Sequence, residues 1–153
     1  MRSFFYLGVI LLFLSGCEHE EASFIETYKS KNDVTTATKK LIARIKEEGL
    51  TYYGTIDHSK NAKSVGLRLP QKTIVLFGNP HFATTLMKCN ASMGLDLPLR
   101  ILISSTYEGE VTIFYTNPEY WSLKHNIKDQ TCLRILNKAS AALEELAEYA
   151  ADK

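Results

Sequence analysis

The segment Thr73–Phe77 constrains the fold of this chain more than any other, because almost all of its residues are apolar. A strand with that composition is expected to be covered on both faces. It runs into Gly-Asn-Pro, where Asn79 suits a helix cap and Pro80 suits the first helical position. The sequence therefore predicts a buried strand followed by a helix from Pro80 to about Cys89. The inward face of this helix is expected to carry Phe82, Leu86 and Met87.

A second Asn-Pro pair, Asn117-Pro118, predicts the same strand-to-helix junction, with a helix to about His125. Further strands are expected over Ser23–Lys29, Leu50–Asp57, Leu97–Ser105 and Val111–Tyr115, the last two joined by a tight hairpin at Glu108-Gly109. Further helices are expected after Asp33, over Asn61–Leu67, and from about Asp129 almost to the end.

These elements predict one α+β domain over residues 24–153. We expect a curved, mostly antiparallel sheet of about five strands, with helices packed on it and a long C-terminal helix. An apolar pocket between the sheet and its helices is compatible with this plan. The aromatic set consists of Phe77, Phe82, Tyr115, Tyr120 and Trp121, and either core packing or a place in the wall of such a pocket suits these side chains.

The N-terminus resembles the signal of a bacterial lipoprotein. Arg2 precedes an apolar run from Phe4 to Leu14, and Ser15-Gly16-Cys17 follows it. The run is shorter than the ~20 residues that cross a bilayer, and its length is typical of a signal peptide. The resemblance implies that residues 1–16 are a signal peptide, that Cys17 is lipidated, and that residues 17–23 are a tether.

This N-terminus predicts a location in the cell envelope, with the membrane bound through lipid on Cys17. Glu18 follows the cysteine in place of the aspartate linked with inner-membrane retention, which favours the periplasmic face of the outer membrane in a cell with two membranes. Lys and Arg number 18 against 17 Asp and Glu, so removing Arg2 leaves a neutral domain. That balance argues against nucleic acid as a partner.

Cys89 and Cys132 remain when Cys17 carries lipid. In an oxidising compartment the two either form a disulfide or stay as buried thiols, and the sequence leaves both alternatives open. The chain has no Cys-x-x-Cys motif and no paired histidines, so no metal site and no cofactor is predicted.

The candidate ligand-binding residues lie mostly at strand ends and helix starts: Asn79, His81, Asp96, Tyr115, Asn117 and His125. If the two Asn-Pro helix starts converge, their N-terminal dipoles could hold a carboxylate or phosphate. The plainer alternative is that Asn79 and Asn117 cap their helices. Likewise, Asp96 is expected to bond the backbone before Pro98, and His125 to close a short helix.

An acid–base enzyme would need Asp57, His58, Asp96 and His125 in one cleft. Asp57 and His58 are neighbours, and side chains of neighbouring strand residues point to opposite faces. The sequence shows no Gly-x-Ser-x-Gly elbow and no Gly-rich phosphate loop. We therefore favour a binding or accessory module for a small ligand or partner over an enzyme, with a structural, dimerising envelope protein as a further alternative.

Four motifs in one order resemble the family called domain of unknown function 302: Tyr53–His58, Phe77–Pro80, Gly94–Leu99 and Tyr115–Pro118. The resemblance spans about Phe24 to His125. It implies a small α+β domain with a curved sheet, and self-association as dimers in some members, but no particular reaction. Members often carry Tyr-Asn-Asp-Pro where this chain has Tyr115-Thr116-Asn117-Pro118, so a carboxylate at that place is lost while a helix cap is kept.

Overall fold

A single antiparallel sheet organises the part of the chain that the computed structural model describes, residues 24–153. Its spatial order is β1-β5-β4-β3-β2, and every neighbouring pair is antiparallel. The strands are β1 (Ile25–Ser30), β2 (Thr51–Asp57), β3 (Lys72–Gly78), β4 (Leu99–Ser105) and β5 (Val111–Thr116). The predicted signal peptide, Cys17 and the tether to residue 23 lie outside the described residues.

The helices are α1 (Val34–Glu47), α2 (His58–Ser64), α3 (Pro80–Cys89), the 3-10 turn η1 (Ala91–Leu95), α4 (Glu119–Lys124) and α5 (Gln130–Ala151). Five of these six elements, all but α4, begin at an N-cap residue whose acidic or amide side chain bonds the unpaired N–H groups of the first turn. Asp33 accepts from Thr36 N, Asn79 from His81 N and Phe82 N, and Asp129 from Thr131 N and Cys132 N.

The α+β class, the sheet of five strands and the long C-terminal helix are thereby confirmed. The predicted helix over Asn61–Leu67 is wrong in its bounds, because Asp57 caps α2 directly at the end of β2 by accepting from Lys60 N. The helix expected from Pro118 to His125 is shorter at both ends, and Asn117 still accepts a hydrogen bond from Glu119 N.

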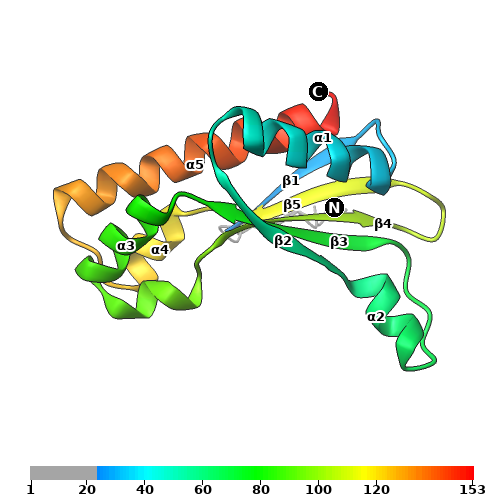
Figure 1. Ribbon diagram of the computed structural model, residues 1–153, viewed down its shortest axis with the longest axis horizontal. Coiled ribbons are helices and arrows are strands. Elements are labelled where there is room, and N and C mark those ends of the chain that lie inside the picture. The colour runs from blue at the N-terminus through cyan, green and yellow to red at the C-terminus, as the bar shows by residue number, and fades with distance from the viewer. Residues whose placement is uncertain (1–23) are drawn as a thin grey trace, which may run out of the picture.

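One face of the sheet is covered by α1 and α5, which lie side by side above it (Figure 1). Both helices bring an apolar stripe to this interface. The fully buried side chains from the strands are Val75, Phe77, Ile101, Ile103 and Ile113, and those from the helices include Ala37, Leu41, Ile45, Ala147 and Ala150. This layer is the core of the domain.

No helix of the described residues spans the opposite face of the sheet, which we call the open face; α2 projects from one end of it and α3 and α4 lie at the other (Figure 1). Residues that alternate with the core residues lie here: Ile56, Ile74, Leu102 and Phe114 form one row across four strands. The expectation that Thr73–Phe77 is covered on both faces is therefore wrong, since Ile74 and Leu76 remain only partly buried.

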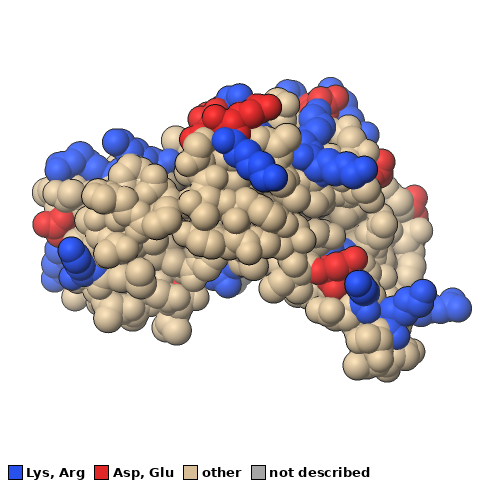
Figure 2. All heavy atoms as spheres, in the orientation of Figure 1, with Lys and Arg blue, Asp and Glu red and all other residues tan. Residues whose placement is uncertain are grey.

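No helix within residues 24–153 has the length and apolar character needed to cross a membrane. Charged side chains gather over α1 and α5 and around α2 in the space-filling view (Figure 2). Some of them pair between the two long helices, with Arg44 Nη2 2.6 Å from Glu145 Oε1. The underside is hollowed between the α3–α4 end and α2 (Figure 2).

Candidate functional site

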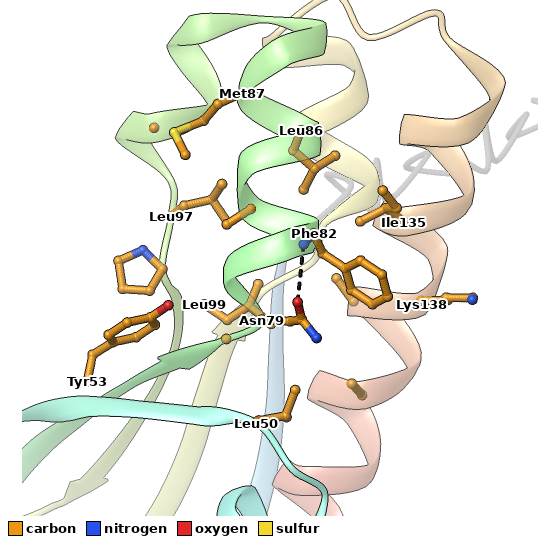
Figure 3. Close-up of a pocket in the computed structure, with 16 residues that line it drawn as sticks. Leu50, Tyr53, Asn79, Phe82, Leu86, Met87, Leu97, Leu99, Ile135 and Lys138 are labelled. Carbon is orange, nitrogen blue, oxygen red and sulfur yellow. Dashed lines mark hydrogen bonds between the residues drawn. The ribbon is translucent and has the colours of Figure 1, made fainter.

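An apolar pocket of about 440 Å³ opens at the end of the sheet where β3 passes into α3. Its walls come from β2, from the β3–α3 junction, from η1 and the start of β4, and from α5 (Figure 3). This size and lining are typical of small-molecule sites. The apolar lining residues include Leu50, Phe82, Leu86, Met87, Leu97, Leu99 and Ile135.

The pocket exists because small residues stand where larger ones would fill the space. Ala83 on α3 and Ala139 and Ala142 on α5 line it, as do Gly78 and Gly94. On α5, Ile135, Lys138, Ala139 and Ala142 follow helical spacing, so one stripe of the helix faces the pocket. The two alanines leave a gap that leucines at the same positions would close.

Phe82 and Met87 form the α3 wall of this pocket and are 36% and 40% exposed. The prediction that they face the core alongside Leu86 is wrong, because only Leu86 of the three is buried. They stay partly exposed because α3 packs on α5 and η1 around the pocket, which leaves this side of the helix partly open.

Three polar side chains border the pocket: Tyr53, Asn79 and Lys138. Tyr53 is the extra residue of a β-bulge, since Tyr52 pairs with Phe77 and Gly54 with Leu76. A bulge redirects the side chain it carries, and the Tyr53 hydroxyl points into the pocket (Figure 3). Lys138 Nζ lies 5.8 Å from the centre of the Phe82 ring and points outward from the rim.

Asn79 has two roles that use different atoms. Its Oδ1 accepts from His81 N at 2.9 Å and Phe82 N at 3.2 Å, which caps α3. Its amide nitrogen lies on the other side, toward the part of the pocket where Leu50 lies (Figure 3). An amide N–H directed into an apolar pocket offers a hydrogen bond to a ligand acceptor.

The α3 wall is held to α5 by a disulfide between Cys89 and Cys132, whose Cα atoms are 6.7 Å apart. Of the two alternatives left open by the sequence, the structure has the bridge. Asp129 places its carboxylate within 4.8 Å of both sulfurs. Because the sulfurs are bonded to each other, this group does not offer two thiolate ligands for a metal.

Asp96 and His125 come together in a cluster, and neither of them lines the pocket. His125 Nε2 lies 2.5 Å from Asp96 Oδ2, and Lys124 Nζ lies 2.9 Å from the same oxygen. His125 Nδ1 lies 2.7 Å from Ser92 Oγ. His125 is only 3% exposed. The cluster joins η1 to α4, and the expectation that Asp96 chiefly bonds nearby backbone is wrong.

The hydrogen bonds of this cluster constrain the protons on His125. The Asp96 carboxylate only accepts, so Nε2 carries the proton between the two residues. Ser92 has one hydroxyl proton and two close acceptors, His125 Nδ1 and Asn90 Oδ1, the latter at 2.8 Å. Donation to Asn90 requires an imidazolium, whereas donation to His125 leaves a neutral ring that could act as a base toward Ser92.

Two opposing effects set the pKa of Asp96. Burial raises it, while the hydrogen bonds and charges of Lys124 and His125 lower it, and the net result is a pKa below the ordinary value for an aspartate. Asp96 is therefore ionised over the physiological range. The cluster is an ion pair that fixes η1, which in turn carries Gly94 of the pocket wall.

The other predicted ligand residues lie apart from the pocket. His81 is exposed on the first turn of α3, with its ring against the edge of Phe82. Tyr115 faces the core and stacks on Tyr28, and burial, with Tyr28 beside it, raises the pKa of its hydroxyl well above the ordinary value. Asn117 bonds Glu119 N and Glu26 Oε1.

The structure thus does not gather the six predicted ligand residues into one site. Asn79 lines the pocket, and Asp96 and His125 pair with each other. Asn79 caps α3, which is the plainer of the two alternatives, whereas the N-cap of α4 is Pro118 and Asn117 just before it accepts from Glu119 N. Asp57 and His58, at the start of α2, lie at the opposite end of the molecule from α4, so the four acid–base candidates do not share a cleft (Figure 1).

The residues that sequence reasoning missed are Tyr53, Lys138 and the small residues of the pocket. One signal for them was present in the sequence. The apolar stripe of the C-terminal helix changes from leucine to alanine at Ala139 and Ala142, which is where the pocket opens. The bulge at Tyr53 carried no comparable signal, although Gly54 after it adopts a φ of 147°.

A family model described as Domain of unknown function DUF302 matches residues 26–148. The chain belongs to this family. A crystal structure of an uncharacterized conserved DUF302 protein from Bacillus stearothermophilus superposes with a TM-score of 0.74 at 18% identity, covering 84% of this chain and 99% of that one. At that identity the likeness supports the fold alone.

Curated relatives include proteins named Fluoride-specific ion channel FluC 1 from Brucella suis and from Brucella abortus, each 31% identical over 105 residues. The matched segment is 69% of this chain but only 41% and 39% of those relatives. The chain therefore spans less than half the length of the curated relatives it matches.

Proposed function

We propose that this protein is a lipid-anchored module of the cell envelope whose DUF302 domain binds a small apolar ligand in the pocket between α3, α5 and the end of the sheet. The observation that carries the proposal is the pocket of about 440 Å³ with a nearly all-apolar lining. Burying apolar ligand surface there contributes ~25 cal/mol per Å².

The polar groups at the border restrict the ligand. The Tyr53 hydroxyl and the Asn79 amide direct donors toward the apolar space, and Lys138 adds a cation at the rim. A ligand that matches has an apolar body with an acceptor oxygen at one end. A medium-length acyl chain with a carboxylate or ester head fits this description, and we take dodecanoate as the probe.

The test fills the pocket. Ala139→Leu and Ala142→Leu together place side-chain volume in the space, and we expect dodecanoate affinity to fall at least ~10-fold. The matched control is Ala141→Leu, an exposed position on the same helix. Calorimetric titration in which the filled variant binds as tightly as the control would falsify the pocket as the binding site.

The anchor is tested separately. In the lipoprotein motif Cys17 receives the lipid, so Cys17→Ser should abolish palmitate labelling and release the protein from membranes. Cys17 is the only position changed, and the disulfide in the domain serves as an internal check of folding. Unchanged membrane retention would overturn the anchoring claim and leave the ligand proposal intact.

The second candidate is acid–base catalysis, which the hydrogen-bonded series Ser92–His125–Asp96 favours. In that case a neutral His125 takes the Ser92 proton as Ser92 Oγ bonds to an ester carbonyl carbon, and the ester C–O bond then breaks, with the leaving alcohol taking the proton from His125. Water, deprotonated by His125 in the same way, hydrolyses the acyl-serine to the carboxylic acid and restores Ser92. A soluble ester such as p-nitrophenyl acetate tests it. Hydrolysis that is lost in both Ser92→Ala and His125→Gln supports an enzyme, whereas equal slow release in all variants contradicts it.

Self-association is a partner proposal that the surface supports. Val65 and Leu67, just after α2, are 70% and 66% exposed. The open face carries the apolar row of Ile56, Ile74, Leu102 and Phe114 as well. Exposed apolar surface of this kind is typical of interfaces. Sedimentation that shows only monomer at high concentration would count against a dimer.

A further inference from the structure

A second cavity, of about 480 Å³, lies on the open face near the β4–β5 hairpin, away from the apolar pocket. The two cavities share no lining residue. Whereas the first is almost wholly apolar, this one combines a lysine and hydroxyl groups with the ring of Phe114. We call it the open-face cleft.

The strand register sets the polar groups of the cleft in a row. Lys72 on β3 pairs with Ser104 on β4, and Ser104 pairs with Thr112 on β5. The row continues to Lys29 on β1, which pairs with Thr112. Paired residues on one face of a sheet lie ~5 Å apart. The row therefore presents an ammonium, two hydroxyls and a second ammonium at regular spacing.

The hydrogen bonds leave donors directed into the cleft. Lys72 Nζ donates to Ser104 Oγ at 2.5 Å. Ser104 is only 8% exposed and accepts this bond, so its own hydroxyl proton is left to donate. Within residues 24–153 no side-chain or backbone acceptor is paired with that proton, and Lys72 keeps two further N–H donors.

Lys72 is a partly buried cation that makes no ion pair within the described residues. A partly buried charge without a counter-ion is costly, and an anion beside it lowers that cost. Glu108 also lines the cleft. Its carboxylate repels any anion, in proportion to the charge of that anion, so a single negative charge is opposed less than several.

The apolar side of the cleft defines the rest of the ligand. Phe114 lines it, and Phe114 belongs to the uncovered row with Leu102 and Ile74. A flat ring or a short hydrocarbon can pack on this row while its anionic group reaches Lys72. Both features are required, because the ammonium alone is open to water on one side.

We propose that the open-face cleft binds a small organic monoanion, with its carboxylate on Lys72, Ser104 and Thr112 and its apolar body on Phe114. This site is independent of the apolar pocket and of any ligand there. It assigns a role to the face of the sheet that no helix of the described residues covers.

The experiment titrates the isotope-labelled full chain, in a non-ionic detergent, with sodium benzoate and records backbone amide shifts by NMR. Benzamide is the neutral control, because it keeps the ring and loses the charge. We expect saturable amide shifts at Ser104 and Thr112 with benzoate, and no saturable shifts at these residues with benzamide. Shifts that map instead to Asn79 and Ala139 would place benzoate in the apolar pocket and overturn the proposal.

Variants make the test specific. Lys72→Met should weaken benzoate binding about tenfold, whereas Lys60→Met, an exposed lysine on α2, should leave it unchanged. If Lys72→Met does not fold, Thr112→Val serves in its place, because it keeps shape and removes one donor. Equal benzoate affinity in the wild type and in the folded cleft variant would overturn the site. Absence of benzoate binding, with the open face covered by a second copy of the chain, would overturn it as well.

Discussion

The two faces of the sheet differ in burial, although they are built from the same strands: helices cover one face, and no helix of the described residues covers the other. Ile101 points into the layer under α1 and α5 and is fully buried, while its neighbour Leu102 points to the open face and is only partly buried. The neighbouring strand β3 carries apolar residues on both faces, Val75 and Phe77 on the covered one and Ile74 and Leu76 on the open one. The faces differ in burial because the two long helices, α1 and α5, both pack on the same side of the sheet (Figure 1).

The apolar composition of a strand sets an upper limit on the surface that it can bury. How much of that surface is buried depends on which face the helices cover. On the covered face, burial of the apolar side chains stabilises the folded state. The open face keeps a row of them beside Lys72, Ser104 and Thr112, where they are available to a ligand or a second copy. Four changes test this contrast, beginning with the largest expected effect.

The disulfide ties α3 to α5, the two helical walls of the apolar pocket, and no disulfide lies on the open face within the described residues. Replacing it by Cys89→Ser with Cys132→Ala frees a loop of 43 residues. We expect a loss of about 4 kcal/mol in the free energy of unfolding, from the loop-closure entropy of the unfolded chain. Urea unfolding measures this, and mass analysis without reductant should find the wild type two hydrogens lighter than its reduced form. Two alkylatable thiols in untreated protein would contradict the bridge.

Ile101→Ala should cost about 3 kcal/mol, because it removes a fully buried side chain and leaves a cavity under α1. Leu102→Ala, one residue further on, is the matched change on the open face and should cost less than ~1.5 kcal/mol. The measurement is the urea midpoint of each variant. Equal losses would show that the open face is buried in solution, for example in a dimer.

Asp96→Asn should cost about 2 kcal/mol at neutral pH, because it removes the charge that Lys124 and His125 face. The pKa of Asp96 in the folded protein is lowered, so the stabilisation is complete above its unfolded pKa of ~3.9 and is lost as the pH falls through the folded value. The gap between wild type and variant should therefore close below about pH 4. Glu108→Gln is the control, and a gap that does not change with pH would rule out the ionised pair.

Ile56→Thr should change the free energy of unfolding by no more than ~0.5 kcal/mol, since Ile56 is 41% exposed on the open face. Thr keeps the β-branched shape that suits a strand. Sedimentation equilibrium is the second readout. Weaker self-association with unchanged stability would place a dimer interface on this face, and a large loss of stability in a monomer would remove the contrast between the faces.

Much of the fold was readable from local patterns. The starts of α1, α3 and α5 follow from Asp33, Asn79 and Asp129, because each cap acts on N–H groups within three residues. The sequence did not reveal which side of the sheet the helices would choose. That choice depends on packing between segments far apart in the chain, such as α1 against α5.

The sites were less readable for the same reason. The pairing of Asp96 with His125 joins residues 29 positions apart, and Lys72 with Ser104 joins residues 32 apart. Local spacing carries no information about such contacts. Asn79 was found because helix capping is local, but its neighbours in the pocket come from β2 and α5.

The bridge between Cys89 and Cys132 also determines what a protease can do to this domain. The chain between the two cysteines contains η1, β4, β5 and α4, together with the exposed hairpin turn at Glu108-Gly109. A cut in that turn divides the polypeptide, but both fragments stay covalently joined through the sulfurs. The nicked domain would migrate as one species until a reductant is added, so damage at this exposed turn does not by itself release a fragment.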